Sequence, residues 1–234
     1  MIATTDTSEK GLEALIVRHL TGQPINADTP DGMIQNAAGQ YLTGGYLQGQ
    51  PADYNRDVAL DVPKLLDFLQ ATQPRVVETL ELGQEGIKRT QFLHRLQGEI
   101  AKRGVVDVLR KGVSHGPVHV DLYQFLPTPG NANAAEQFDR NRFSVTRQLR
   151  YSNDEIARSL DLVIFINGLP IATFELKNSL TKQTVADAIL QYQTDRHPRE
   201  ILFQMGRCMV HFAVDDSQVA FCAHLTGTTS WFLP

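Results

Sequence analysis

The sequence has few cysteines and no long apolar run. Cys208 and Cys222 are the only cysteines among its 234 residues, and neither belongs to a CxxC pair. A zinc site or a disulfide framework is therefore not expected, and both thiols are predicted to be small core residues. No stretch reaches roughly 18 consecutive apolar residues, and the N-terminus has no apolar signal core. These absences predict a cytoplasmic protein with no membrane contact.

The sequence also lacks an excess of basic charge. Its formal net charge is −4, with 22 Lys and Arg against 26 Asp and Glu, so no positive field covers the whole surface. Affinity for nucleic acid would have to come from a local patch or from partner segments. A P-loop of the form GxxxxGK[ST] is absent as well, so these residues are not expected to bind ATP.

The first half of the chain has helical periodicity. Residues 9–20 predict a helix with Ser8 as its N-cap and one apolar face, made of Leu12, Leu15, Ile16 and Leu20. Residues 21–57 predict a loop. Helices are again expected from residue 61, where Pro63 suits a first turn, to residue 112, with a stop at Gly104. We expect a helical insertion at 58–112 ahead of a catalytic core at 115–225, within a single domain spanning 1–234.

The second half changes to the alternating period of strands. Strands are predicted over 118–126, 142–152, 160–166, 169–177, 208–215 and 219–225, with a helix at 184–195 capped by Thr184. LDLVIFI and LPIATFELK are joined by Asn167-Gly168, which strongly favours a two-residue hairpin turn. The predicted fold is α/β (α+β), with a mixed sheet flanked by helices.

An acid opens the first of these two hairpin strands, and an acid and a lysine end the second. Side chains two positions apart on a strand share a face, so Glu175 and Lys177 point the same way, and the hairpin can place Asp161 level with them. Two carboxylates suit Mg²⁺, and phosphodiester hydrolysis uses such an ion together with a cation near the attacking water. The alternative is an exposed Glu175–Lys177 ion pair at a strand end, and the bare spacing does not decide between the two.

The stretch SLDLVIFINGLPIATFELKNSLTKQTVADAILQYQTDRHPRE resembles the N-terminal nuclease region of type I restriction–modification R subunits, in the PD-(D/E)xK nuclease superfamily. The resemblance extends upstream through NRFSVTRQLRYS and downstream through HFAVDDSQVAFCAHL, so it covers most of the chain. It implies a restriction-endonuclease-like core and Mg²⁺-dependent cleavage of double-stranded DNA.

The resemblance also implies roles for individual residues. Asp161 and Glu175 would hold the metal and Lys177 would act on water and phosphate, while Gln191 on the following helix would help to position them. Many relatives have tyrosine four positions after that glutamine, but this chain has Asp195 there. An acid on the first helix often faces the metal in the superfamily, which makes Glu13 the better candidate and Glu9 the weaker one. The alternatives are that Gln191 is a solvated polar position and that the acids of the first helix are surface carboxylates.

In this family the R subunit is longer and carries helicase-type motor domains that use ATP. The resemblance therefore implies ATP for the complete enzyme, motor domains after residue 234, and a complex with specificity and methyltransferase subunits. Phosphate contacts are expected from a set of basic residues near the acids, with ordinary solvated side chains as the alternative: Arg142, Arg147, Arg150, Lys182 and Arg196. Two other functions stay open, a catalytically silent DNA-holding or subunit-docking module and a stand-alone repair-type nuclease.

Overall fold

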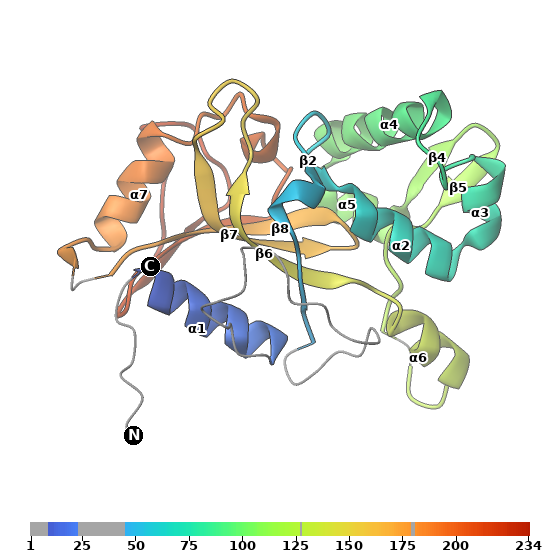
Figure 1. Cartoon of the computed structure of the whole chain (residues 1–234), viewed down its shortest axis with the longest axis horizontal. Coiled ribbons are helices and arrows are strands. Elements are labelled where there is room, and N and C mark those ends of the chain that lie inside the picture. The colour runs from blue at the N-terminus through green and yellow to red at the C-terminus, as the bar shows by residue number, and fades with distance from the viewer. Residues whose placement is uncertain (1–8, 23–44, 127, 179–180) are drawn as a thin grey trace.

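The computed structural model describes residues 9–22, 45–126, 128–178 and 181–234. Its main feature is a mixed six-stranded sheet in the order β1-β6-β7-β8-β9-β10, with helices packed against it (Figure 1). The predicted mixed α/β class is therefore confirmed. Ser8, the predicted cap of the first helix, lies outside the described residues. Within those residues, no helix combines the length and the apolar character needed to cross a membrane.

The sheet combines antiparallel and parallel pairs. β6 and β7 are antiparallel, as are β7 and β8 and also β9 and β10, whereas β1 with β6 and β8 with β9 are parallel. The strands are β1 (Leu47–Gln48), β6 (Phe143–Arg150), β7 (Ser159–Ile166), β8 (Leu169–Leu176), β9 (Val210–Val214) and β10 (Val219–Cys222). The predicted core bounds of 115–225 therefore leave out β1, which lies beside β6.

The turn between β7 and β8 has the expected geometry. Asn167 and Gly168 both have positive φ, 50° and 79°, as a type I′ turn requires. The Asn167 amide also donates to the carbonyl of Leu122 at 2.9 Å. A Cβ added at Gly168 would lie 2.3 Å from the carbonyl oxygen of Asp61, so both the turn and the close packing require glycine.

A β-bulge in β8 decides which residues face each other near the end of the hairpin. Phe165 pairs with Pro170 next to the turn, but Ile164 pairs with Ala172, so Ile171 is an extra residue on β8. Leu162 then pairs with Phe174, and the same register places Asp161 opposite Glu175. Without the bulge Asp161 would lie opposite Phe174, and Glu175 would point to the other face. The bulge therefore brings the two acids together.

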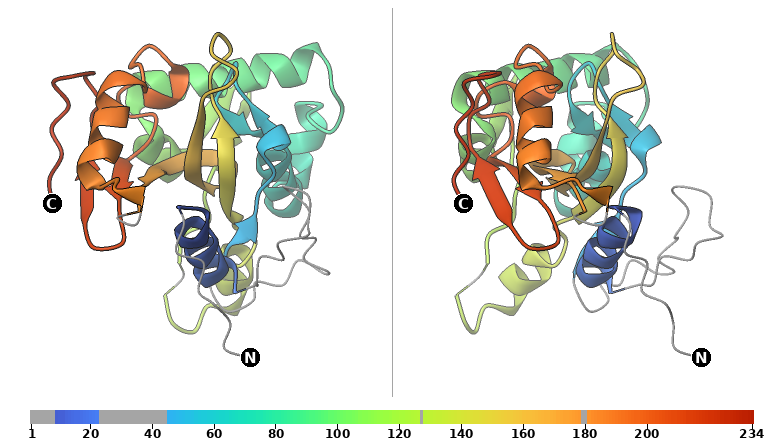
Figure 2. Two further views of the ribbon diagram at one scale, coloured as in Figure 1. Left: turned by 60° about the vertical axis from the view of Figure 1, so that its left-hand side comes forward. Right: turned by 90° about the vertical axis from the view of Figure 1, so that its left-hand side faces the viewer.

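Helices α1 (Glu9–Thr21) and α7 (Val185–Thr194) cover opposite faces of the sheet (Figure 2). α1 packs through Val17 on Leu162, whereas α7 packs through Tyr192 on the side of Val163. The predicted apolar face of α1 is partly wrong, because Leu15 is 59% exposed. The helix is rotated so that other residues face the sheet, and its buried positions are Gly11, Glu13, Val17 and Thr21.

A second group of helices lies beside the sheet, around its own core (Figure 1). It contains α2 (Val62–Thr72), α3 (Pro74–Thr79), α4 (Ile87–Arg103) and α5 (Val105–Lys111), together with β4 (Val113–His115) and β5 (Val118–Val120). The short helix α6 (Ala132–Phe138) follows and has no buried residue. Leu169 and Ile171 of β8 belong to the same core. Helices were predicted from residue 61, and the structure has them from residue 62 onward. The helix α4 ends at Gly104, whose φ is 81°. Residues 60–61 form β3 with β2 (Tyr54–Asn55) instead.

Candidate active site

The three groups predicted to carry the chemistry meet between α1 and α7, at the end of the β7–β8 hairpin away from the turn. Glu175 is fully buried, Lys177 is 9% exposed, and Asp161 is half-buried. Asp161 and Lys177 are both close enough to Glu175 to shift its pKa, in opposite directions. The alternative of an exposed Glu175–Lys177 ion pair is therefore wrong, because both side chains are inside the protein.

Glu175 is held by an arginine that follows α7. Arg196 Nε donates to Glu175 Oε1 at 2.6 Å, and this guanidinium also donates to Tyr151 Oη at 3.1 Å and to the carbonyl of Ser159 at 2.8 Å. Burial raises the pKa of Glu175 to about 8, Arg196 opposes this shift, and the charge of Asp161 adds to it. A further cation beside this carboxylate would favour its charged form.

Asp161 is fixed by two donors from neighbouring strands. The backbone N–H of Leu176 donates to its Oδ2 at 2.7 Å, and the side-chain amide of Gln148 donates to its Oδ1 at 3.2 Å. The first bond ties Asp161 to the residue between Glu175 and Lys177, so the position of this carboxylate depends directly on the β7–β8 register.

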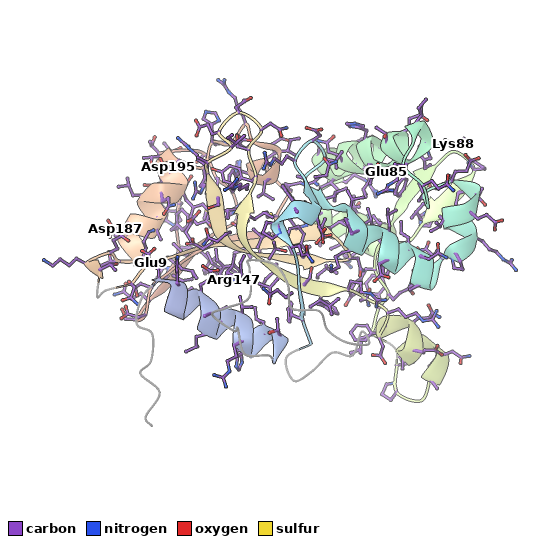
Figure 3. All side chains as sticks on the ribbon, viewed as in Figure 1. Glu9, Glu85, Lys88, Arg147, Asp187 and Asp195 are labelled. Carbon is purple, nitrogen blue, oxygen red and sulfur yellow. The ribbon has the colours of Figure 1, made fainter. Side chains whose placement is uncertain are left out.

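The first helix also contributes an acid to this place. Glu13 is 3% exposed and forms an ion pair with Arg147, and Gln148 Nε2 donates to its Oε2 at 3.0 Å. The alternative of a surface carboxylate is therefore wrong. Burial raises the pKa of Glu13, Arg147 and Gln148 oppose this, and Asp161 adds to it. The neighbouring candidate, Glu9, lies with its Oε1 3.7 Å from Lys177 Nζ. Figure 3 shows Glu9 at the start of α1 and Arg147 above this helix.

The acids are not arranged as a preformed metal cage. Among the described residues, no group of three or more His, Cys, Asp or Glu side chains is placed to hold a metal ion. Two of the acids are instead paired with arginines, Glu13 with Arg147 and Glu175 with Arg196. One oxygen is still available, because Glu175 Oε2 is buried without a hydrogen-bond partner in the described part of the chain. A buried carboxylate oxygen without a donor, opposite a second carboxylate, fits a hard divalent cation.

The predicted helix residues lie on or just after α7. Gln191 is half-buried there, and nothing in the geometry tests its positioning role, which stays a prediction. Asp195 caps the C-terminal end of α7, and its carbonyl accepts from Tyr151 Oη at 3.2 Å. Tyr192 is fully buried, and its Oη lies 2.8 Å from Thr173 Oγ1.

The basic residues predicted to contact phosphates do not form one track. Arg196 is 3% exposed and paired with Glu175, so a phosphate could reach it only by displacing that carboxylate. Arg142 binds Asp67 at 2.5 Å next to the hairpin turn, at the opposite end of β6 from the acids. Arg150 and Lys182 are exposed, and Arg147 is partly exposed beside Glu13. Their contacts with DNA stay predictions.

Comparison with known proteins identifies the family. The family model described as "Type I restriction enzyme R protein N terminus" matches residues 65–230. The chain belongs to this family. It is also similar to a protein of Methanocaldococcus jannaschii provisionally named the type I restriction enzyme MjaIXP endonuclease subunit, with 37% identity over 79 residues. That alignment covers 32% of this chain and 8% of the relative, so the chain spans only a small part of the relative's length.

The part that matches the type I R-protein family contains Asp161, Glu175 and Lys177 but begins after α1. Glu13 lies outside the matched residues, and the packing of α1 against the sheet brings it to the site. Two further site residues were not predicted from the sequence, namely Gln148 as a bridge and Arg196 as the partner of Glu175. The adjacent polar pair Arg147-Gln148 interrupts the alternation of β6, and this interruption is the signal that marks an irregular backbone there.

A buried polar chain lies behind Glu175 in this R-protein domain. Thr173 Oγ1 is 2.8 Å from Tyr192 Oη and 2.8 Å from His211 Nδ1. Burial lowers the pKa of His211 to about 3, so the imidazole is neutral in the folded protein at neutral pH. The unfolded chain binds a proton at this residue below about pH 6.5.

Lowering the pH from 7.5 to 5 is therefore expected to reduce the free energy of unfolding by about 2 kcal/mol through His211 alone. The folded pKa is depressed, so this stability is present above the unfolded pKa and is lost as the pH falls below it. Urea unfolding of the wild type and of His211→Asn at both pH values isolates this contribution, because Glu175 also titrates over this range in both proteins. On acidification the wild type should lose about 2 kcal/mol more than His211→Asn, or gain about 2 kcal/mol less. His94→Asn, at an exposed histidine, is the control and should keep the wild-type dependence. An unchanged dependence in His211→Asn would contradict the assignment.

Proposed function

We propose that this chain is the nuclease domain of a type I restriction enzyme R subunit and hydrolyses phosphodiester bonds of double-stranded DNA with Mg²⁺. The observation that carries the proposal is the meeting of Asp161, Glu175 and Lys177, with the buried Glu175 Oε2 still lacking a donor. Membership of the type I R-protein family supports the same reaction. The core would then be of the PD-(D/E)xK type.

Each residue has a role that its place supports. Asp161 and Glu175 supply the hard oxygen ligands that Mg²⁺ prefers, and Mg²⁺ when bound would polarise the phosphate and acidify a water. The Lys177 ammonium lies beside these acids and would orient the attacking water and offset the charge that develops on the phosphate. Arg196 holds one oxygen of Glu175, and the other, which has no donor among the described residues, would be free to bind the ion.

We also propose the assembly in which the site works. The R subunit acts in the cytoplasm with specificity and methyltransferase subunits, which supply DNA recognition that this chain does not provide. ATP use belongs to motor domains elsewhere in the complete protein. Exposed basic residues such as Arg150 and Lys182 contact DNA phosphates without reading the sequence.

A second candidate is a catalytically silent DNA-holding or docking module. The ion pairs of Glu13 and Glu175 favour it, because a domain without a metal ion needs arginines to neutralise buried acids. In that case the same residues stabilise the fold and perform no chemistry.

The test is DNA cleavage by the complete restriction complex that contains this chain. Asp161→Asn and Glu175→Gln keep side-chain size and remove charge, and each is expected to reduce Mg²⁺-dependent cutting of unmodified plasmid by about 10³-fold or more. ATP hydrolysis by the same complex is the control and should be unchanged. Cutting at the wild-type rate by both variants would exclude this site and support the silent module.

A further inference from the structure

Gln148 is the one residue that touches both Glu13 and Asp161 among the hydrogen bonds of the described chain. Its Nε2 donates to Glu13 Oε2 at 3.0 Å and to Asp161 Oδ1 at 3.2 Å. The two hydrogens of one amide nitrogen thus serve two carboxylates. One of these acids belongs to α1 and the other to β7, so the amide links a helix to a strand.

The orientation of this amide is set by a third contact. Ser159 Oγ lies 3.1 Å from Gln148 Oε1 and donates to it. Ser159 lies two residues before Asp161 on β7. The amide oxygen is therefore directed to a hydroxyl, and the amide nitrogen is directed to the two acids. The reverse orientation would place the amide oxygen against carboxylate oxygens with no hydrogen between them.

The backbone of Gln148 is unusual in a strand. Its φ is 47°, a left-handed conformation that residues with a side chain rarely adopt. Gln148 lies opposite Asp161 in the β6–β7 register. The flanking residues pair as Arg147–Leu162 and Leu149–Leu160, but Gln148 and Asp161 do not pair. Such strain persists only where the surroundings enforce it, and it is concentrated at functional sites.

The contacts of Glu13 show why such a link is needed. Asp161 raises the pKa of Glu13, because two like charges this close repel each other. Arg147 neutralises Glu13, and among the described residues it forms no hydrogen bond or ion pair with Asp161. Gln148 is neutral and short enough to hold both carboxylates near each other without cancelling their charge.

We propose that Gln148 is a positioning residue that holds Glu13 of α1 and Asp161 of β7 together as parts of one divalent-cation site. This inference rests on the proposed function, and it adds α1 to the metal site through a residue that does not itself bind the ion. Partners of this kind, which orient metal ligands, typically change metal affinity by about 10–100-fold when they are removed.

The test measures Mn²⁺ binding to the 234-residue chain by electron paramagnetic resonance of the free ion, without DNA. Mn²⁺ prefers the same oxygen ligands as Mg²⁺. Gln148→Ala removes the amide and keeps the strained backbone, whereas Gln148→Gly removes the amide and relieves the strain. Both variants are expected to weaken Mn²⁺ binding by about 10–100-fold. Gln84→Ala, at an exposed glutamine, should bind as the wild type does.

Urea unfolding of the same proteins separates positioning from a purely structural role. Gln148→Gly should unfold at a higher urea concentration than Gln148→Ala, yet bind Mn²⁺ equally poorly. Wild-type affinity in Gln148→Gly would overturn the inference, because relief of strain would then be enough. Wild-type affinity in both variants would overturn it too, while leaving the proposed function standing. Failure of the wild-type chain to bind Mn²⁺ would instead overturn the shared metal site and, with it, this inference.

Discussion

Replacing Arg196 by leucine is expected to lower the free energy of unfolding by about 3–5 kcal/mol. Arg196 is the hydrogen-bonded cation of the fully buried Glu175, with 2.6 Å between Nε and Oε1. Its loss leaves the Glu175 carboxyl in an apolar interior without the cation that favours its charged form. The variant also removes the bonds that Arg196 donates to Tyr151 and to the backbone of Ser159.

The pH dependence of the Arg196→Leu loss follows from the pKa of Glu175. This pKa is already raised to about 8 in the wild type, so the folded state holds a proton that the unfolded state releases above about pH 4.5. Stability linked to a raised carboxyl pKa is present at low pH and is lost as the pH rises through the folded value. Without Arg196 the pKa of Glu175 rises further, so the destabilisation should be larger at pH 9 than at pH 6.

Urea unfolding with linear extrapolation measures these losses. Arg199→Leu, at an exposed arginine three residues later, is the matched control and should change stability by less than about 0.5 kcal/mol. The double variant Arg196→Leu with Glu175→Leu should recover most of the loss, because replacing both partners removes the uncompensated charge. Equal stability of Arg196→Leu and Arg199→Leu would contradict the buried ion pair.

Replacing Lys177 by methionine is expected to slow DNA cleavage by about 10³-fold while leaving divalent-cation binding intact. Methionine keeps most of the apolar stem and removes the ammonium. Lys177 is nearly buried and lies 3.7 Å from Glu9, a weak contact whose loss should cost less than about 1 kcal/mol of stability. The loss of activity would therefore come from the missing cation at the phosphate.

Single-turnover cleavage of supercoiled plasmid by the complete complex measures the Lys177 effect, and Mn²⁺ titration of the 234-residue chain measures the binding. Lys182→Met, at an exposed lysine, should cut within a few-fold of the wild-type rate. A Lys177→Met complex that cuts as fast as Lys182→Met would show that the ammonium takes no part in the chemistry.

The local signals in the sequence predicted the framework of the site well. Asn167-Gly168 gave the hairpin turn, because positive φ at two successive positions is a local requirement. Pro63 and Gly104 marked helix ends for equally local reasons. Asp161, Glu175 and Lys177 could be placed on one hairpin because the turn limits how its strands can pair.

The remaining features of the site depend on tertiary contacts that no local pattern records. The bulge at Ile171 aligns Asp161 with Glu175. No turn residue in the sequence marks this bulge, and Ile171 packs into the core of the helical group. Arg196 reaches Glu175 only because α7 folds back on the sheet. Glu13 is not part of the apolar face predicted for α1, but the rotation of that helix buries it and exposes Leu15.

The position of a bound divalent ion tests the central claim most directly. Substoichiometric Mn²⁺ added to the isotopically labelled 234-residue chain broadens backbone amide signals steeply with proximity to the ion. Signals from Asp161, Leu176 and Lys177 should disappear first in the wild type and persist in Asp161→Asn. Broadening centred on another part of the chain, or broadening that Asp161→Asn leaves unchanged, would contradict a divalent ion shared by Asp161 and Glu175.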